Sequence, residues 1–569
     1  MRFFHLLLKA CALTLVFVAV AMAQETTGGL QGTVKDSSGA VVPHAKVVVA
    51  GTALVGTKEI ETDTSGYYRF ANLSPGTYTI TVEAKGFKTI KQQGLIIEVG
   101  HLPSVDFRLE VGTETTTIEV TSEAPLVDPT TSRTMTNVTD DVINYVPHGE
   151  SYQSIIQFAP SARNEPLMGG VGTSNFKATG GCSPTGCSNG QAAGYQVGGA
   201  SDSENGYLIE GQDTANNIGG YSHTNVPFDF IEEVQVKTTG LEAEHGGALG
   251  GVSNVIVKKG GNNWHGTVIA EYNSSALNGS PNDYLRYDPS SSGSLLKVNG
   301  VTVGGIDPGA QLFDAKKDTT KDFFPGFTLA GPIKKDRLWF FAGFKPQFIK
   351  DRRTVNFNSQ GLGSLNFDEN TQTYYTNGRL DASLTRKIRL YSSWLYQYQR
   401  QSGQALPFAD ARNGLLNVSA TAPPFVFAHG LGYGAPNHTT TVGADFSLTP
   451  RLVATTHFSY FFENYRDFGY PTGGTIFQWF TSGVAPATDT NGNPLPASLR
   501  QVAGFFNVAN NINNTVRNAN KHLQFNQDLA WFKSGLWGTH NFKFGYQLNQ
   551  LSNDIYQRYN EPDINLFVG

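Results

Sequence analysis

The feature that most constrains the fold is an alternation of aromatic or aliphatic residues with polar residues in the C-terminal half of the chain. Side chains that repeat every two residues are typical of β-strands. In the stretch 388–399, one face carries Ile388, Leu390, Trp394, Tyr396 and Tyr398, and the other carries Arg389, Ser393, Gln397 and Gln399. The same alternation recurs at 452–462 and 540–549. The pattern predicts strands with one apolar and one polar face.

These strands are predicted to form hairpins with very short turns. The expected pairs are 326–332 with 337–345, 377–384 with 388–399, 441–448 with 452–462, and 522–531 with 540–549. Long connections rich in Gly, Asn and Pro, at 401–440 and 468–521, alternate with the short turns. This asymmetry is typical of an outer-membrane β-barrel. The alternative is a soluble β-sandwich or adhesin, which would need a second sheet to cover the aromatic faces.

The N-terminus has the composition of a secretory signal. Arg2 and Lys9 supply positive charge ahead of an apolar run from Ala10 to Val20. Ala21-Met22-Ala23, which follows, has the small-x-small form of a cleavage site. No later run reaches ~18 apolar residues, so a place in a membrane would require a closed barrel. With 42 Lys and Arg against 47 Asp and Glu, the chain is mildly acidic, which argues against nucleic acid as a partner.

Residues 29–110 predict a small β-sandwich. Six short β-rich runs are separated by turns such as Ser37-Ser38-Gly39 and Ser74-Pro75-Gly76. The runs are 30–35, 45–50, 66–70, 76–84, 94–99 and 104–109. The pattern around Gly32, Asp36, Pro43, Asp63 and Gly86-Phe87 resembles the carboxypeptidase regulatory-like domain. That resemblance implies a carbohydrate-binding-like sandwich without peptidase activity; Asp36 and Asp63 are expected to bond local backbone in turns.

Residues 123–262 predict a compact mixed α/β domain. A helix is expected from Asp141 to Pro160, with Tyr152, Ile155, Ile156 and Ala159 on one face. Three strands are expected, at 207–210, 231–237 and 252–258. Cys182 and Cys187 lie in a predicted Gly/Ser-rich loop. They form either a local disulfide or two free thiols, and the sequence leaves both alternatives open. A zinc site is not expected, because no second cysteine pair exists in the exported chain.

Four glycines, Gly246, Gly247, Gly250 and Gly251, directly precede the strand at 252–258. Glycine permits positive φ and close approach of one backbone to another surface. We therefore expect this segment to fit closely against the curved wall of a barrel that begins near His265.

The motifs of this region resemble those of a known family. The stretches Tyr207–Gly211, Ile231–Val236, His245–Val252 and Asn254–Gly260 are similar to the plug of TonB-dependent outer-membrane transporters. Gly326–Asp336 and Trp339-Phe340-Phe341 resemble the first barrel hairpin of the Oar-like branch, which also carries a regulatory-like sandwich. The resemblance implies a barrel of ~22 strands that is plugged in its lumen and takes up an extracellular ligand.

The family also implies a segment ahead of the plug that pairs by strand addition with a TonB-type inner-membrane protein. The segment Thr115, Thr116, Thr117, Ile118, Glu119, Val120 and Thr121 is similar to it. An ordinary linker strand is the alternative. The expected partners are thus the TonB-type protein, outer-membrane lipid and an unknown extracellular ligand.

No catalytic motif is present, so the chain is not expected to be an enzyme or to carry a cofactor. It has no H-E-x-x-H, no G-x-S-x-G and no P-loop. Glu242, Glu244 and His245 offer metal-ligand atoms, but solvated polar residues ahead of a turn are the favoured interpretation because no second cluster supports them. The loose glycine pattern at 430–435 lacks the flanking strand and helix of a dinucleotide site.

The sequence therefore predicts a mostly β chain in five parts. These are a signal peptide at 1–23, a β-sandwich at 24–112, a coupling segment at 113–122, an α/β plug at 123–262 and part of an antiparallel transmembrane β-barrel at 263–569. About ten to twelve strands are expected after residue 264, half of a full barrel, so we expect a fragment or a truncated gene. The predicted function is energy-coupled uptake at the outer membrane of a Gram-negative-type bacterium, and the alternative is a secreted carbohydrate-binding or adhesive protein.

Overall fold

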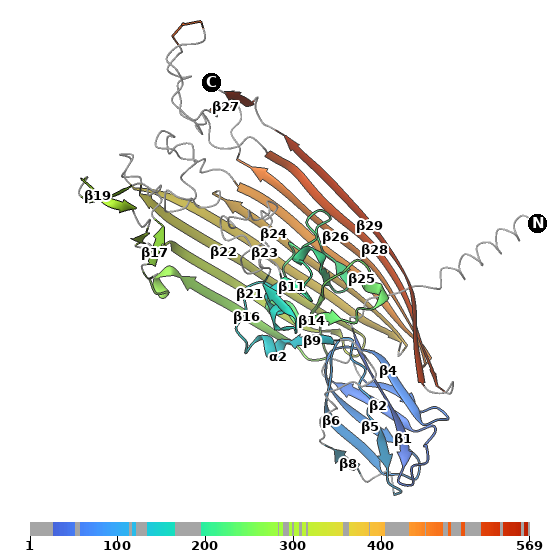
Figure 1. Cartoon of the computed structure of the whole chain (residues 1–569). Coiled ribbons are helices and arrows are strands. Elements are labelled where there is room, and N and C mark those ends of the chain that lie inside the picture. Colours follow the sequence, from blue (N-terminus) through green and yellow to red (C-terminus); the bar gives the residue numbers. More distant parts are fainter. Residues whose placement is uncertain are drawn as a thin grey trace, which may run out of the picture.

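The computed structural model arranges the chain as a β-sandwich, an inner domain and a large curved sheet (Figure 1). It describes residues 27–51, 57–112, 117–120, 134–164, 195–280, 282, 284–287, 295–298, 301–306, 310–313, 317–356, 364–385, 387–403, 432–449, 451–469, 476–479, 491–494, 514–534, 539–558 and 563–566. The predicted signal peptide and the pair Cys182 and Cys187 lie outside the described residues.

The sandwich consists of two sheets packed over one apolar core. The smaller sheet has the order β4-β1-β7, from β1 (Gly28–Asp36), β4 (Tyr67–Leu73) and β7 (Phe107–Leu109). The larger has the order β3-β2-β5-β6-β8, from β2 (Lys46–Gly51), β3 (Thr57–Glu61), β5 (Gly76–Glu83), β6 (Thr89–Ile97) and β8 (Thr117–Val120). Alternate residues of several strands, such as Val47 and Val49 of β2, are fully buried between the sheets.

All six strands that the sequence predicted in this region are present, and β3 is an additional one. The pattern of β3 was missed because Lys58, Glu59 and Glu61 make it polar. The expected turn contacts of the two aspartates are confirmed. Asp36 accepts from the N–H of Ser38 at 2.8 Å, and Asp63 accepts from the N–H of Ser65 at 2.7 Å.

The inner domain, which we call the plug, is the described part of residues 134–260. Its five-stranded sheet has the order β13-β12-β15-β14-β9. The strands are β9 (Thr134–Thr139), β12 (Gly206–Ile209), β13 (Gln212–Asp213), β14 (Ile231–Thr239) and β15 (Val252–Val257). A separate two-stranded antiparallel sheet pairs β10 (Ala162–Asn164) with β11 (Tyr195–Val197). The three predicted strands are thus present, and β14 and β15 are buried along most of their length.

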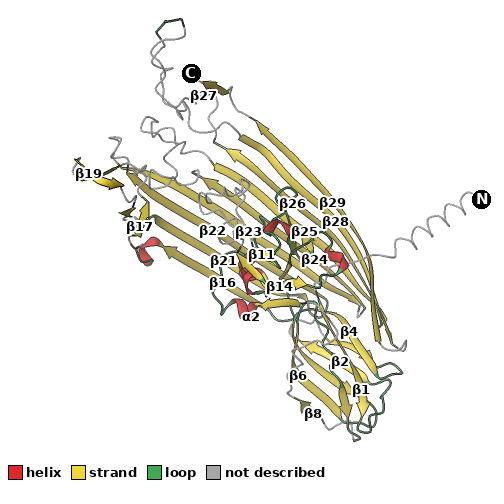
Figure 2. Cartoon of the chain, in the orientation of Figure 1, coloured by secondary structure: helices red, strands yellow, loops and turns green. Residues whose placement is uncertain are grey.

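The continuous helix predicted from Asp141 to Pro160 is wrong. Two short pieces replace it, the helix α2 (Asp140–Ile143) and the 3₁₀ helix η1 (Tyr152–Phe158), which Figure 2 shows among the few helical segments. Pro147 and Gly149 lie between them and interrupt helical geometry. The apolar positions themselves were read correctly, because Tyr152, Ile155, Ile156 and Ala159 are all buried in the plug core.

The large sheet contains nine antiparallel strands. They are β16 (His265–Ser274), β21 (Thr319–Lys334), β22 (Leu338–Asn356), β23 (Ser364–Thr385), β24 (Ile388–Ser402), β25 (Gly432–Thr449), β26 (Leu452–Phe468), β28 (Asn514–Ser534) and β29 (Thr539–Arg558). All four predicted hairpins are confirmed, as β21–β22, β23–β24, β25–β26 and β28–β29. We call the end of the sheet where these hairpins turn the turn end.

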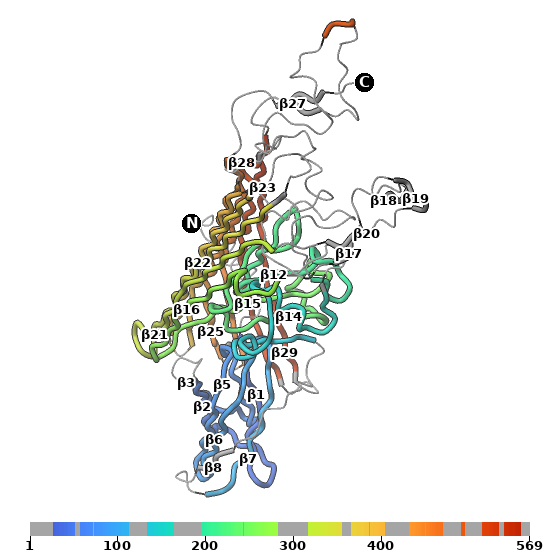
Figure 3. Tube along the Cα trace, turned by 90° about the vertical axis from the view of Figure 1, so that its left-hand side faces the viewer, coloured from blue at the N-terminus to red at the C-terminus, as the bar shows by residue number. Residues whose placement is uncertain are grey.

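The alternation along these strands separates two environments. On β24, Leu390 and Trp394 are exposed on the outer face, whereas Tyr391, Ser393, Leu395 and Gln397 are buried on the inner face. On β26, Phe458 is exposed, and His457, Ser459 and Glu463 are buried. The predicted apolar and polar faces are therefore confirmed. The plug lies against the inner face (Figure 3).

The predicted number of ten to twelve strands after residue 264 does not match the sheet. Within the described residues, nine strands form it, and β16 and β29 each pair with one neighbour there. Six short strands form separate pairs: β17 (Tyr284–Tyr287) with β20 (Ala310–Phe313), β18 (Leu295–Val298) with β19 (Val301–Ile306), and β27 (Ile476–Trp479) with β30 (Asp563–Leu566). None of the helices in the described parts is long and apolar enough to cross a lipid bilayer.

Candidate functional site

Buried ion pairs and hydrogen bonds join the plug to the inner face of the sheet. At the centre of this contact, the hairpin of β12 and β13 turns through Glu210 and Gly211, whose φ angles are 51° and 78°. Positive φ at both central residues is the geometry of a tight type I′ turn, which a glutamate adopts only under constraint. The turn directs the Glu210 carboxylate toward the sheet.

Glu210 is held from two sides. Its Oε2 lies 2.7 Å from Nη1 of Arg379 on β23, and its Oε1 accepts from the N–H of Val257 at 2.8 Å. Arg379 also pairs with Asp381, Nε to Oδ2, at 2.8 Å. All three charged side chains are almost completely buried. Because a buried charge is costly without a partner, this triad fixes the plug at one position against the sheet.

A second set of contacts joins the plug segment 213–225 to strands β24, β25, β26 and β28. Glu463 on β26 accepts from Asn216 Nδ2 and lies 3.1 Å from His223 Nδ1. Asn225 N–H donates to Gln397 Oε1 at 2.8 Å, and Asn437 Nδ2 donates to Thr224 Oγ1 at 2.7 Å. The polar inner face of the sheet thus recognises the plug by side-chain hydrogen bonds across buried surface.

Lys345 on β22 provides a third attachment that the sequence did not indicate. Its Nζ lies 2.7 Å from Asp229 Oδ2 of the plug and 2.9 Å from Glu271 Oε1 of β16. The signal for this site was weak, since a single lysine between two aromatic-rich stretches has no distinctive spacing. Apolar packing continues beside it, where the rings of Phe230 and Phe341 meet edge to face with centroids 6.2 Å apart.

The glycine-rich segment lies in the plug, but two of its glycines do not face the barrel wall. A Cβ on Gly250 would collide with Asn205, and one on Gly251 would lie 2.6 Å from Val197 Cγ1, both within the plug itself. Gly247 has φ 97° in a tight turn. The expected reason for Gly250 and Gly251 is therefore wrong: they allow close packing inside the plug.

Close glycine contacts between plug and sheet occur elsewhere. Gly260, at the end of the plug, lies against the backbone of Phe340 on β22. Gly343, on the same strand, faces Phe230 of the plug, and a Cβ there would lie 2.5 Å from Phe230 Cε1. The sequence analysis assigned no wall contact to either glycine: Gly260 appears there only as the end of the stretch Asn254–Gly260, and Gly343 stands alone between aromatic residues.

Glu242, Glu244 and His245 come together, with ligand atoms within 4.8 Å of one another. Two lysines already lie among them. Lys237 Nζ is 3.2 Å from Glu242 Oε2, and Lys543 Nζ of β29 is 2.7 Å from Glu244 Oε1. The positive charge of an ammonium beside each carboxylate repels a divalent cation and therefore disfavours metal binding. The chemistry of this group is therefore that of an ion-pair network between the plug and β29.

The predicted coupling segment falls partly within the described residues. Thr117–Val120 form β8, which pairs in parallel with β6 from Thr89↔Thr117 to Gln92↔Val120. Thr115, Thr116 and Thr121 lie outside the described residues. Because β8 is the last strand in its sheet, its other edge pairs with no described strand.

The sandwich is docked at the turn end of the large sheet and against the plug (Figure 1). Tyr67 stacks on Phe532 of β28 with ring centroids 4.3 Å apart, and Asp63 forms an ion pair with Arg451. On the plug side, Val99 donates its N–H to Glu233 Oε1 at 3.2 Å. Burial raises the pKa of Glu233 to about 8, and the nearby Glu98 adds to that rise.

A curved antiparallel sheet with an apolar outer face, a polar inner face and a separate domain held against the inner face defines the fold of a plugged outer-membrane β-barrel. The chain is similar in sequence to an Oar-type transporter: it is 27% identical over 356 residues to the TonB-dependent transporter Oar of Myxococcus xanthus. That match covers 61% of this chain and 29% of the relative, so the chain spans less than a third of that protein.

Residues 29–110 match the family model of the carboxypeptidase regulatory-like domain. Among solved structures, the chain is similar to the outer membrane transporter YddB of Escherichia coli, with 13% identity, a TM-score of 0.49 and coverage of 76% of this chain and 50% of that one. It is also similar to the ferric enterobactin receptor PfeA of Pseudomonas aeruginosa, with 14% identity, a TM-score of 0.42 and coverage of 74% and 50%.

Proposed function

We propose that the chain belongs to a transporter that takes up a ligand across the outer membrane with energy supplied through a TonB-type inner-membrane protein. The observation that carries this proposal is the plug held against the polar face of the sheet by the buried triad of Glu210, Arg379 and Asp381. Ion pairs and hydrogen bonds exchange readily with water, so a domain held in part by such contacts can be released and docked again. The transporter activity of the Oar relative supports the same proposal.

The proposed route of energy coupling is strand addition at β8. An edge strand presents a row of backbone N–H and C=O groups to which another chain can pair. The open edge of Thr117–Val120 supports this role for the coupling segment. An ordinary linker strand is the alternative, and the crosslinking experiment below separates the two.

A proline substitution tests the coupling proposal. Ile118→Pro removes one backbone N–H from β8, whereas Ile118→Ala retains it and serves as the matched control. With a photo-crosslinker at Glu119, the parent chain and the alanine variant are expected to crosslink to TonB in whole cells. The proline variant is expected to lose that crosslink while its amount in the outer membrane is unchanged. Equal crosslinking by all three chains would contradict the assignment.

Cell fractionation tests the location. The apolar outer face predicts that the chain remains with outer membranes after salt and carbonate washing. Recovery of the chain in the washes, or free in the medium, would instead support the secreted carbohydrate-binding or adhesive alternative.

A further inference from the structure

Exposed basic side chains form a row across the outer face of the large sheet, toward the end opposite the turn end (Figure 1). We call that opposite end the loop end. Each basic residue of the row stands 12 to 14 residues from the point where its strand ends at the turn, as Arg400 does from Ile388. We call this row the basic belt, and it consists of Lys321 of β21, Lys350 of β22, Arg400 of β24, Arg466 of β26 and Lys521 of β28.

The belt residues point away from the plug. Asn520 and His522, on either side of Lys521, are buried on the inner face, and so is Gln401 next to Arg400. Because side chains along a strand alternate between the two faces, Lys521 and Arg400 belong to the outer face. All five belt residues are exposed.

The belt lies at the far limit of an uncharged zone. On β22 the outward residues from Phe340 to Phe348 carry no charge, and the same holds on β24 from Leu390 to Tyr398. At ~3.3 Å per residue and a strand tilt of ~35–45°, 12 to 14 residues span a height of about 30–35 Å. The hydrocarbon core of a bilayer is ~30 Å thick. With the turn end at one edge of the hydrocarbon, the belt stands at the level of the lipid head groups on the other side.

The acidic residues on the outer face near the belt already have cationic partners. Arg352 lies 2.6 Å from Asp368, and Arg517 lies 2.8 Å from Asp554. Within the part of the chain that the structure describes, no carboxylate forms an ion pair with a belt residue. The belt is therefore a surface of positive charge directly beside an apolar surface.

Lys321 and Lys350 lie directly opposite each other on the paired strands β21 and β22. The Cβ atoms of such a pair are ~4.5–5.5 Å apart, and like charges in this arrangement destabilise a sheet. Asp322 and Asp351, the next residues in the chain, alternate to the opposite face. An anion bound between the two ammonium groups would remove the repulsion.

Arg400 and Arg466 flank a position that has no side chain. Gly434 of β25 pairs with Arg400 on one side and with Arg466 on the other. Two strand spacings place the arginine Cα atoms about 10 Å apart. The guanidinium of Arg400 is positioned over the ring of Phe468, 4.2 Å from its centre. Two guanidinium groups directed over Gly434 can both donate hydrogen bonds to one phosphate group.

We propose that the basic belt binds the phosphate groups of anionic lipids in the leaflet at the loop end, with the acyl chains of these lipids along the aromatic outer face. This inference rests on the proposed place of the chain in the outer membrane. The arginines favour phosphate because their planar donors match its oxygens in pairs, and the lysines add attraction for its charge. Lipids held at this level fix the depth of the sheet in the bilayer.

Electron paramagnetic resonance of spin-labelled lipids tests the proposal. A label near the end of an acyl chain distinguishes lipids held against a protein from free lipids. The full chain is reconstituted in phosphatidylcholine vesicles with labelled phosphatidic acid, phosphatidylcholine or stearic acid. Phosphatidic acid is expected to associate about fivefold more strongly than phosphatidylcholine, and more strongly than stearate.

Paired substitutions locate the preference. The double variants Lys321→Gln with Lys350→Gln and Arg400→Gln with Arg466→Gln are each expected to reduce the preference for phosphatidic acid to about half or less. Lys35→Gln with Lys85→Gln, at exposed positions of the sandwich, makes the same change in net charge and should leave the preference unchanged. The phosphatidylcholine signal of each variant shows whether that variant is inserted as the parent chain is.

Three results would overturn the proposal: equal association of phosphatidic acid and phosphatidylcholine, association of stearate as strong as that of phosphatidic acid, or an equal loss of preference in the sandwich variant. In each of them a normal phosphatidylcholine signal leaves the proposed membrane location standing. If no lipid is held against the chain, phosphatidylcholine included, the proposed location fails together with the belt. The measurement needs neither TonB nor uptake.

Discussion

The guanidinium of Arg379 on the sheet lies 2.7 Å from the carboxylate of Glu210 at the tip of a plug hairpin, although 168 residues stand between them in the chain. Both side chains are almost completely buried. This pair connects the two largest parts of the molecule and determines how firmly the plug is held.

Removing one partner of this pair should loosen the plug. Arg379→Met leaves the Glu210 and Asp381 carboxylates buried without their cation, which should cost about 3–5 kcal/mol of plug docking. Hydrogen exchange of segment 206–213 should increase markedly. The matched control is Arg352→Met, which breaks the exposed Arg352–Asp368 pair, 2.6 Å in length, on the neighbouring strands. That change should cost only about 0–1 kcal/mol. Equal protection in both variants would show that the buried pair does not hold the plug.

A methyl group at Gly343 should disturb the same interface through packing alone. The added Cβ of Gly343→Ala would lie 2.5 Å from Phe230 Cε1, and Phe230 is fully buried. Overpacking of this kind costs about 1–3 kcal/mol. Gly378→Ala on the adjacent strand is the control, since its Cβ would meet only Trp394 at 3.9 Å. Thermal unfolding in detergent should show a lower midpoint for the first variant and an unchanged one for the second; the reverse order would refute the packing argument.

Local patterns were sufficient to predict most strands of the large sheet. The period of two at 388–399 and 452–462 is a local property of neighbouring residues, because one face of these strands is exposed and apolar and the other faces the plug. The contacts between the plug and the inner face of the sheet could not be predicted in this way. Nothing near Arg379 in the sequence indicates Glu210, because their contact depends on how two separately folded parts dock.

The wrong predictions have physical causes of the same kind. Tyr152, Ile155 and Ile156 share a helical spacing, but a 3₁₀ helix of seven residues places them in the core equally well. Gly250 and Gly251 were expected to approach the barrel wall. The atoms nearest to a Cβ at these positions belong instead to Asn205 and Val197 of the plug. A glycine cluster predicts close packing; it does not indicate which surface approaches.

Docking of the sandwich on the plug should weaken as the pH rises. Burial raises the pKa of Glu233 from 4.5 to about 8, and Glu98 and Glu232 contribute further, while the hydrogen bond from the Val99 N–H and the charge of Lys259 oppose the shift. A carboxyl with a raised pKa in the docked state stabilises that state fully below pH 4.5. This stabilisation is lost progressively as the pH rises toward about 8.

Glu233→Gln isolates this effect. The glutamine keeps an oxygen that can accept from the Val99 N–H but does not titrate. Protection of the Val99 amide against hydrogen exchange, corrected for the intrinsic rate at each pH, should fall from pH 5 to pH 8 in the parent chain and stay level in the variant. Glu83→Gln, at an exposed position of the sandwich, should behave as the parent does. A level profile in the parent chain would contradict the role of Glu233.

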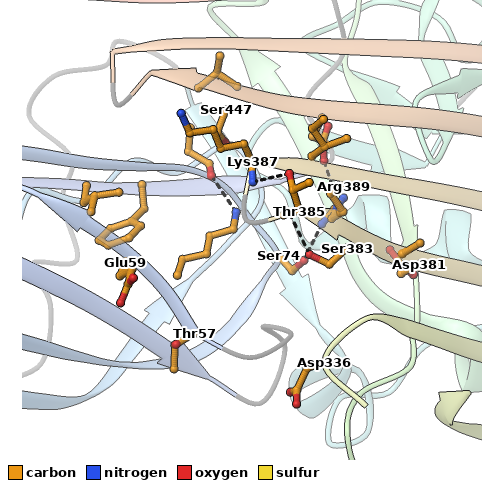
Figure 4. Close-up of a pocket in the computed structure, with 18 of the residues that line it drawn as sticks. Thr57, Glu59, Ser74, Asp336, Asp381, Ser383, Thr385, Lys387, Arg389 and Ser447 are labelled. Carbon is orange, nitrogen blue, oxygen red and sulfur yellow. Dashed lines mark hydrogen bonds and ion pairs between the residues drawn. The ribbon is translucent and has the colours of Figure 1, made fainter. Parts of the chain in front are cut away.

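Phe532 should anchor the sandwich to the sheet. Its ring stacks on Tyr67 at 4.3 Å between centroids and lies under the Arg69 guanidinium at 5.6 Å. Phe532→Ala removes both contacts, a loss of about 3–5 kcal/mol when the ring is buried. A short amine-reactive crosslinker should join Lys58 to Lys387 in the parent chain, because both line the cavity between the sandwich and the turn end of the sheet (Figure 4), and the yield should fall strongly in the variant. Phe544→Ala, on the exposed face of β29, should leave the yield unchanged. If Phe532→Ala retains the full yield, contacts other than this ring stack hold the sandwich at the turn end.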